Sequence, residues 1–310
     1  MKSLKFSLIL TFLLVGNSVS CQTKIDSFRI YNDVKITLDQ PRYENKKTIL
    51  VLFALPNGNT TEQTMGKKIT ANDDWHFDIQ HIMAQTAFLR DKMNENIVVA
   101  YLENNFKSWP QWKQKHPSFK EEIQHIVDTL FSLVPAKNKT IYLNGHSGGG
   151  SFIFGYLDGI NKIPKSVERI TFLDSDYGYD SSYSGKLITW LHNNSNATLT
   201  VFAYNDSVAL YNGKPIVSEK GGTWYRSHLM MQHLQNDGFH FRQTKNDSLI
   251  FYRSTNNQVA FFFKTNPERK IFHTQQVELN GFIHSILYRT KKENEGYEYF
   301  GQRAYSKFIE

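Results

Sequence analysis

The feature that most constrains the fold of this chain is the stretch IYLNGHSGGGSFIFGYL at residues 141–157. It places Ser147 among glycines, after a short apolar run typical of a buried strand and before apolar residues at helical spacing. A strand that leads directly into a helix needs a sharp turn, and a non-glycine residue at its apex is held in a strained conformation that small neighbours relieve. The segment Gly145–Gly149 reads G-x-S-x-G, the nucleophile elbow, in its strand–turn–helix context. We predict that the Ser147 hydroxyl points out of the core as a nucleophile.

Other kinds of site are disfavoured by what the sequence lacks. A glycine-rich loop at a helix N-terminus can bind phosphate, but neither G-x-x-x-x-G-K-[ST] nor G-x-G-x-x-G is present here. A single cysteine excludes thiolate clusters and no H-E-x-x-H motif occurs, so we predict no metal site and no cofactor. The formal net charge is +7, yet lysines and arginines are scattered, which favours a solvated surface over a nucleic-acid partner.

Short apolar runs alternate with longer mixed stretches along the chain. Predicted strands occupy residues 28–38, 47–55, 96–102, 141–143, 169–174, 198–204, 248–252 and 259–264. Predicted helices occupy residues 78–92, 118–134 and 223–234, the second with a capping-box pattern of Ser118 and Glu121. This alternation predicts the α/β class, with a mostly parallel sheet and helices on both faces. No repeat or linker interrupts residues 21–310, so we expect a single domain there.

The first twenty residues are predicted to be an export signal. Lys2 and Lys5 precede a short apolar core, and a small, polar cleavage region ends at Ser20. The next residue, Cys21, resembles the acylated first residue of a bacterial lipoprotein, although Ser18 stands where a leucine is usual. We therefore expect an exported envelope protein that is attached to the membrane through Cys21, with ordinary secretion as the alternative.

A serine nucleophile needs an imidazole to take its proton and a carboxylate to orient that imidazole. With the elbow and the strand pattern in place, residues 47–290 resemble an α/β-hydrolase, in which the acid and then the histidine follow the serine. The resemblance implies Asp206 as the acid, because it follows the second strand after the elbow. Asp174 and Asp176, which follow the first such strand, remain the alternative acids.

The same resemblance implies the remaining parts of a catalytic site. His284, late in the chain, is the predicted base and His273 is its competitor, whereas His146 is expected to pack beneath the turn. The backbone N–H of Gly148 is one predicted oxyanion donor. Asn57, in the loop after the strand at 47–55, is the candidate for the second.

These residues predict a serine hydrolase that cleaves carboxylic esters through an acyl-enzyme. Aromatic residues make up 14% of the chain, and rings can line a groove for sugars or aromatic acyl groups, so an acylated glycan is a candidate substrate. Two alternatives remain open. One is a serine peptidase or amidase on the same fold, and the other is a non-catalytic, glycan-binding envelope lipoprotein.

Overall fold

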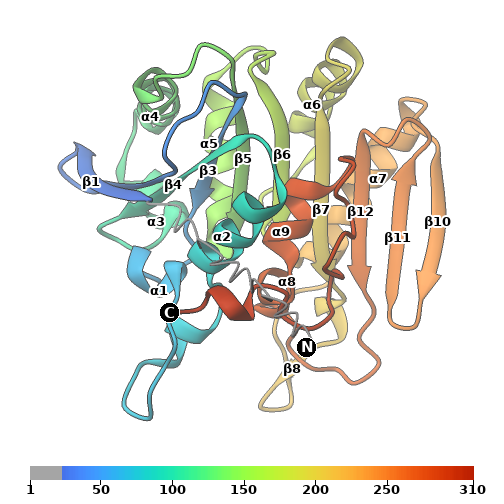
Figure 1. Cartoon of the computed structure of the whole chain (residues 1–310). Helices are drawn as coiled ribbons and strands as arrows, with labels where there is room; N and C mark the ends of the chain where they lie inside the picture. The colour runs from blue at the N-terminus through green and yellow to red at the C-terminus, as the bar shows by residue number, and fades with distance from the viewer. Residues whose placement is uncertain (1–22) are drawn as a thin grey trace, which may run out of the picture.

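The structure is a computed structural model that describes residues 23–310, so the predicted signal and Cys21 lie outside the described residues. Its centre is a ten-stranded sheet in the order β1-β2-β4-β3-β5-β6-β7-β12-β11-β10 (Figure 1). The strands are β1 (Lys24–Tyr31), β2 (Val34–Gln40), β3 (Thr48–Ala54), β4 (Asn96–Asn104), β5 (Lys139–His146), β6 (Val167–Leu173), β7 (Thr198–Tyr204), β10 (Phe241–Asn246), β11 (Leu249–Ser254) and β12 (Val259–Lys264). A separate small hairpin consists of β8 (Leu210–Tyr211) and β9 (Lys214–Pro215).

The centre of the sheet is parallel and both of its edges are antiparallel. Strands β4, β3, β5, β6, β7 and β12 run in one direction. Every residue of β3, of β7 and of β12 is buried, as expected for parallel strands covered on both faces. Strand β10 reads FRQTKN and is largely exposed, which is why its sequence carries no apolar signal.

Helices cover both faces of the sheet, and consecutive residues of β3 show the division. Leu50 and Leu52 belong to one hydrophobic core, whereas Val51 and Phe53 belong to the other, because side chains of a strand alternate between faces. The first face packs against α3 (Trp109–Lys115), α4 (Phe119–Leu133), α5 (Gly150–Gly159), α6 (Ser181–Asn193) and α7 (Thr223–Asn236). The second packs against α2 (Ile82–Lys92), α8 (Gln275–Glu278) and α9 (Gly281–Leu287), which lie in front of the sheet in Figure 1. The predicted α/β class is thus confirmed.

One local prediction is wrong. The Ser118 side chain makes no capping hydrogen bond, because its backbone (φ −95°, ψ 24°) is not in the extended conformation that a capping residue needs. A capping box exists instead at the short helix α1 (Thr61–Met65), between Thr60 and Gln63.

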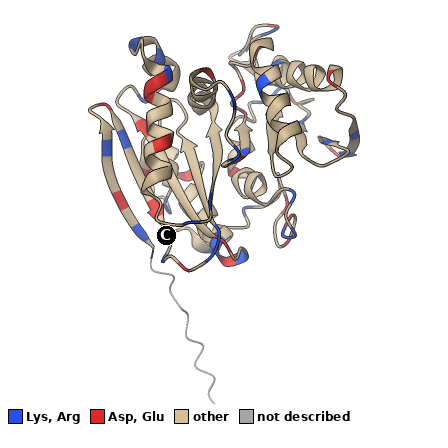
Figure 2. Ribbon diagram, turned by 90° about the horizontal axis from the view of Figure 1, so that it is seen from above, with Lys and Arg blue, Asp and Glu red and all other residues tan. Residues whose placement is uncertain are grey.

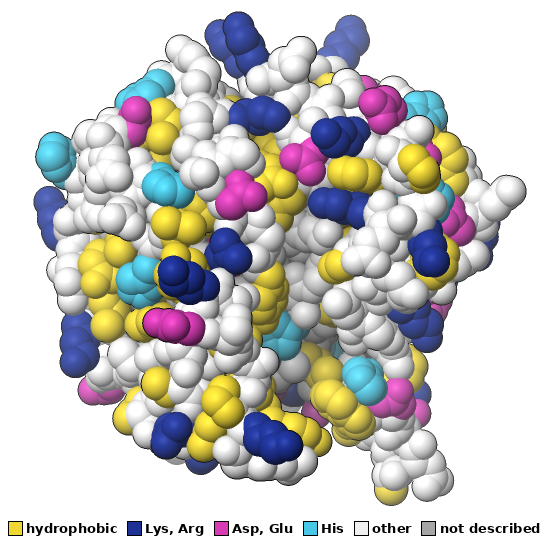
Figure 3. Space-filling model, turned by 180° about the vertical axis from the view of Figure 1, so that it is seen from behind, with side chains coloured by type: hydrophobic (Ala, Val, Ile, Leu, Met, Phe, Trp, Pro, Cys, Tyr) yellow, Lys and Arg dark blue, Asp and Glu magenta, His cyan; other side chains and the backbone are white. Residues whose placement is uncertain are grey.

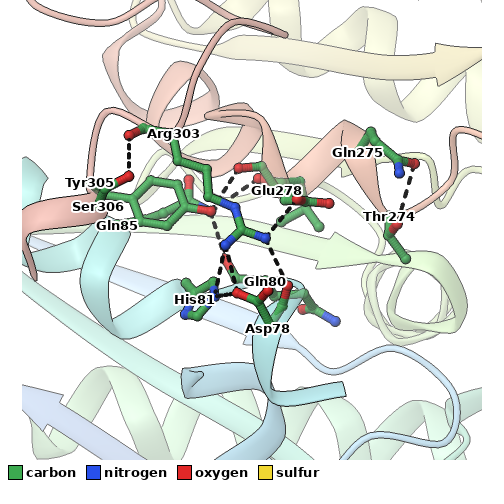
Figure 4. A network of polar contacts seen from close by, with 11 residues as sticks. Asp78, Gln80, His81, Gln85, Thr274, Gln275, Glu278, Arg303, Tyr305 and Ser306 are labelled. Atoms are coloured by element: carbon green, nitrogen blue, oxygen red, sulfur yellow. Dashed lines mark hydrogen bonds and ion pairs between the residues drawn. The ribbon is translucent and has the colours of Figure 1, made fainter. Parts of the chain in front are cut away.

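Arg303 is one of the residues that tie the C-terminal segment to the front layer (Figure 4). Arg303 donates to the Asp78 carboxylate at 2.6 Å and to the Glu278 carboxylate at 2.7 Å. Asp78 also accepts from the buried His81 ring at 2.7 Å. Because Glu278 ends α8, this network fixes the segment that follows β12.

The surface is mixed in charge. Lysines and arginines are spread along the ribbon and are interspersed with aspartates and glutamates (Figure 2). Within residues 23–310, no helix has the length and apolar character needed to cross a membrane.

Candidate active site

Ser147 occupies the apex of the turn between β5 and α5. Its φ is 54°, in the left-handed region that a non-glycine residue rarely adopts. The neighbouring glycines are needed because the chain is crowded there. A β-carbon at Gly149 would lie 2.1 Å from the Ala54 carbonyl oxygen, and one at Gly150 would lie 1.7 Å from that of Ser175. The strained turn with small neighbours is therefore present, and it leaves Ser147 partly exposed at the carboxyl end of the sheet.

Ser147 lines a cavity of about 500 Å³. The lining residues are Asn57, Pro110, Lys113, Ser147, Gly148, Ser151, Phe154, Ser175, Tyr177, Gly178 and Tyr183. Asn57 touches the elbow, since a β-carbon at Gly148 would lie 1.9 Å from the Asn57 Oδ1. The structure therefore brings together Ser147 and the two residues that the sequence suggested for oxyanion binding.

A second cavity of about 650 Å³ adjoins the first. It is lined by Tyr177, Tyr204, Tyr211, Asn212, Lys214, Pro215, Ile216, Val217, Ile271 and His273. Tyr177 lines both cavities, so the cavity that contains Ser147 and the cavity that contains His273 share this side chain. The face turned away from the viewer in Figure 1 is hollowed in its lower half, at the end of the sheet where the parallel strands terminate (Figure 3).

His273 lies in the loop between β12 and α8, beside the elbow. Its ring centroid is 4.6 Å from that of His146, the residue before Ser147, and its carbonyl oxygen is 3.2 Å from the His146 Nε2. The His273 Nδ1 donates to the Asp174 Oδ2 at 2.5 Å. This bond places the proton on Nδ1, so Nε2 of the neutral ring is free to accept a proton.

Asp174 directly follows β6 and is fully buried. Its φ is 46°, so this residue is also in the left-handed region. The Thr223 hydroxyl donates to the carboxylate oxygen that His273 does not use. Asp174 is therefore held from both sides, with its charge directed at the His273 ring.

Asp176 and Asp206 lie close to Asp174 but contact other groups. Asp176 is buried and accepts from the Ser227 hydroxyl at 2.8 Å, and burial raises its pKa. Asp206 accepts from the backbone N–H of Thr223 at 2.8 Å, at the start of α7. Burial, and then the charge of Asp174, raise the pKa of Asp206 to about 6. The choice of Asp206 as the partner of the histidine is thus corrected: the carboxylate that contacts a histidine beside Ser147 is Asp174.

The prediction of His284 as the base is also corrected. His284 belongs to α9 and is sealed in the layer opposite the Ser147 cavity, 2% exposed, with its ring centroid 4.6 Å from that of Phe262. Its Nδ1 pairs with the Tyr297 hydroxyl at 3.0 Å. Burial, followed by the charges of two nearby arginines, lowers its pKa to about 3. Both His273 and His284 follow the serine and the acid in the chain, so chain order could not distinguish them. Their exposure does, because the His273 side chain is partly exposed and His284 is buried.

The strand order, the antiparallel edge before β4 and the elbow at the end of β5 together define the architecture. The fold is that of the α/β-hydrolases. Among solved structures, the chain is similar to poly(aspartic acid) hydrolase-1 from Sphingomonas sp. KT-1, at 12% identity and a TM-score of 0.46 over 86% of this chain and 98% of that one. It is also similar to a siderophore hydrolase from Aspergillus nidulans, at 12% identity and a TM-score of 0.42 over 90% and 99%.

A bacterial brefeldin A esterase is similar at 10% identity and a TM-score of 0.41, over 90% of this chain and 78% of that one. No family model and no curated protein matches the sequence. Among residues 23–310, no group of three or more His, Cys, Asp or Glu side chains is arranged to hold a metal ion.

Proposed function

We propose that the protein is a serine hydrolase that cleaves carboxylic esters through an acyl-enzyme, with Ser147 as nucleophile, His273 as base and Asp174 as the acid. The observation that carries the proposal is the His273–Asp174 hydrogen bond beside the elbow that presents Ser147. The three parts follow one another along the chain in the order serine, aspartate, histidine, as they do in α/β-hydrolases.

In each half of the proposed reaction, His273 takes a proton from the attacking hydroxyl and then gives it to the departing oxygen. His273 takes the proton of the Ser147 hydroxyl while the oxygen attacks the ester carbonyl, and Asp174 stabilises the imidazolium that forms. The Gly148 N–H and the Asn57 side chain stabilise the negative oxygen of the tetrahedral intermediate. The imidazolium then gives its proton to the leaving alcohol, and water repeats the sequence to release the acid and restore Ser147.

The two cavities divide the substrate between them in this proposal. The oxyanion donors belong to the cavity of Ser147, so this cavity holds the acyl group. The cavity of His273 holds the leaving group, since that group must receive the proton from the imidazolium. Its exposed apolar side chains, Tyr211 at 64% and Ile271 at 43%, offer a surface on which a sugar ring can stack, and this supports an acylated glycan as substrate.

A peptidase or amidase would use the same groups, so matched substrates must separate the activities. A 4-nitrophenyl ester and the corresponding 4-nitroanilide carry the same acyl group. We expect turnover of the ester to exceed that of the anilide by at least about 100-fold, because a nitrophenolate can leave without a proton whereas the anilide nitrogen must be protonated by the imidazolium. Comparable rates on both would favour an amidase.

The cellular location is part of the proposal. The signal-like residues 1–20 and the cysteine that follows them support export and lipid attachment in a bacterial envelope, with secretion as the alternative. Export would place the hydrolase where acylated envelope glycans are accessible.

The test of the function is labelling with a fluorophosphonate probe, together with hydrolysis of an activated ester. Wild type should be labelled, and Ser147→Ala should lose both labelling and about 10⁶-fold in kcat, as expected when a triad acts as a unit. Ser151→Ala is the matched control, since Ser151 lines the same cavity from α5. A wild type that the probe does not label would instead support a non-catalytic glycan-binding protein.

A further inference from the structure

Asp206 lies one hydrogen-bonded residue away from the His273–Asp174 pair. Strands β6 and β7 are neighbours, so the residues that follow them, Asp174 and Asp206, meet at the same end of the sheet. Thr223, the first residue of α7, contacts both. Its hydroxyl donates to the Asp174 Oδ1 and lies 3.3 Å from the Asp206 Oδ2, while its backbone N–H donates to that same Asp206 oxygen at 2.8 Å.

The Asp206 carboxylate is fitted closely to the start of α7. Its Oδ2 accepts from the Thr223 N–H, and its Oδ1 accepts from the Trp224 N–H at 3.4 Å. A β-carbon at Gly222 would lie 2.3 Å from either oxygen, so glycine is required at this point. A shift of the start of α7 would therefore break the hydrogen bonds between its N–H groups and the Asp206 carboxylate, so the position of Thr223 depends on Asp206.

The Thr223 hydroxyl has only one proton to donate. The closer of the two carboxylates is Asp174, so the proton is directed there. This bond occupies the Asp174 oxygen that faces away from His273 and leaves the other oxygen to the imidazole. A chain of contacts therefore runs from Asp206 through Thr223 and Asp174 to His273.

We propose that Asp206 is a positioning residue for the hydrolysis, which acts through Thr223 to hold the acid Asp174 and which adds a second negative charge behind His273. The inference rests on the proposed function. In it, Asp174 acts as the acid and Asp206 holds Asp174 in position.

The other titratable groups around Asp206 and Asp174 come from several elements. Asp176 and Tyr177 lie on the segment after β6, Tyr204 ends β7, and the His146 ring at the end of β5 contacts the His273 ring. Burial, and then the charges of Asp174 and Asp206, raise the pKa values of Tyr177 and Tyr204. Both tyrosines are thus neutral, and burial raises the pKa of Asp176, so Asp174 and Asp206 are left to supply the negative charge behind the imidazole.

The experiment compares Asp206→Asn, Thr223→Val and Thr223→Ser in kcat, KM and the pH profile of kcat/KM on an activated ester. An asparagine has one acceptor oxygen for two N–H donors, so Asp206→Asn should lower kcat by about 10- to 100-fold with KM within about threefold of wild type. The acid limb of the profile, which reports imidazole protonation, should move to lower pH by about half a unit or more, because a nearby negative charge is removed. Thr223→Val should lose kcat comparably without that shift, and Thr223→Ser should recover to within about threefold of wild type, since it restores the hydroxyl.

Asp39→Asn is the control. Asp39 of β2 is an equally buried carboxylate that pairs with Arg90 of α2. Since β2 lies next to the edge strand β1, far from β6 and β7, loss of this carboxylate should leave the pH profile in place. If Asp206→Asn does not fold, the Thr223 pair decides the positioning role by itself. Wild-type kcat and an unmoved acid limb in Asp206→Asn, or wild-type kcat in Thr223→Val, would overturn the inference. Loss of activity in His273→Gln and Asp174→Asn alongside that result would show that the proposed function stands without it.

Discussion

Replacing His284 by phenylalanine should reverse the order of stability of the two proteins between neutral and mildly acidic pH. Burial lowers the pKa of His284 from 6.5 to about 3 in the folded state. Because His284 is a base, its lowered folded pKa costs no stability above pH 6.5. Stability is lost as the pH falls from 6.5 toward 3, since the unfolded state then takes up a proton that the folded state does not. Folding at about pH 5 must keep this imidazole neutral across roughly 1.5 pH units, which lowers the free energy of unfolding by about 2 kcal/mol relative to about pH 7.5.

Phenylalanine keeps an aromatic ring against Phe262 and Tyr299 but removes the proton site. At neutral pH the variant should be less stable by about 1 kcal/mol, because the Tyr297 hydroxyl loses its partner. Near pH 5 it should be more stable than wild type by about 1 kcal/mol, since the cost of keeping His284 neutral is gone. Urea denaturation at the two pH values measures both differences, and hydrolysis of an activated ester should stay within about threefold of wild type.

Two results would refute this reasoning. If wild type and His284→Phe lose the same free energy of unfolding on acidification, His284 is not the buried neutral ring described above. If the variant is folded but inactive while His273→Gln is active, His284 is the base after all.

Three further perturbations have defined outcomes. Gly148→Ala should lower kcat by about 100- to 1,000-fold, because its β-carbon would overlap the Asn57 side chain; Gly185→Ala, with open space around its β-carbon, should stay fully active, and ester kinetics checks both. Arg303→Gln should lower the free energy of unfolding, measured in urea, by about 2–3 kcal/mol, because Asp78 and Glu278 lose their shared cation. Arg303→Lys should not restore this stability, because an ammonium lacks the planar fork of donors, and full rescue by lysine would contradict the prediction. Cys21→Ser should move the protein from the membrane fraction to the soluble one with unchanged ester turnover, and a wild type that is already soluble after fractionation would count against lipid attachment.

The strands that the sequence predicted best are those whose continuous apolar residues indicate burial on both faces. The runs at 47–55, 96–102, 198–204 and 259–264 are covered on both faces, and each became a strand of the parallel core. The turn at Ser147 was predictable because its backbone is so crowded that a β-carbon at Gly149 or Gly150 would clash, so the sequence has glycine at these positions. Strand β10 was missed because a polar edge strand is defined by its hydrogen bonds to β11 and not by apolar periodicity.

The site was predictable only in part, for a different physical reason. Asp174 and Asp206 follow neighbouring parallel strands, so chain order places both in the same region and cannot say which one meets the histidine. That is decided by the path of the loop after β12, which carries His273 to β6 and leaves Asp206 to the start of α7. His284 resembled a base in sequence, yet every residue of the helix that carries it is buried.

The tie made by Arg303 has a consequence for how the protein matures. Synthesis proceeds from the N-terminus, so Arg303 is made after every strand of the sheet and after both of its partners, Asp78 and Glu278. Until it arrives, Asp78 and Glu278 face the same position as two like charges with no cation between them, and their repulsion opposes docking of α8 and of the His273 loop that precedes it. A nascent or truncated chain without residue 303 can build most of the parallel sheet and present Ser147, but it holds the histidine segment loosely. We therefore expect the segment that carries His273 to be among the last parts of the protein to become fixed during folding.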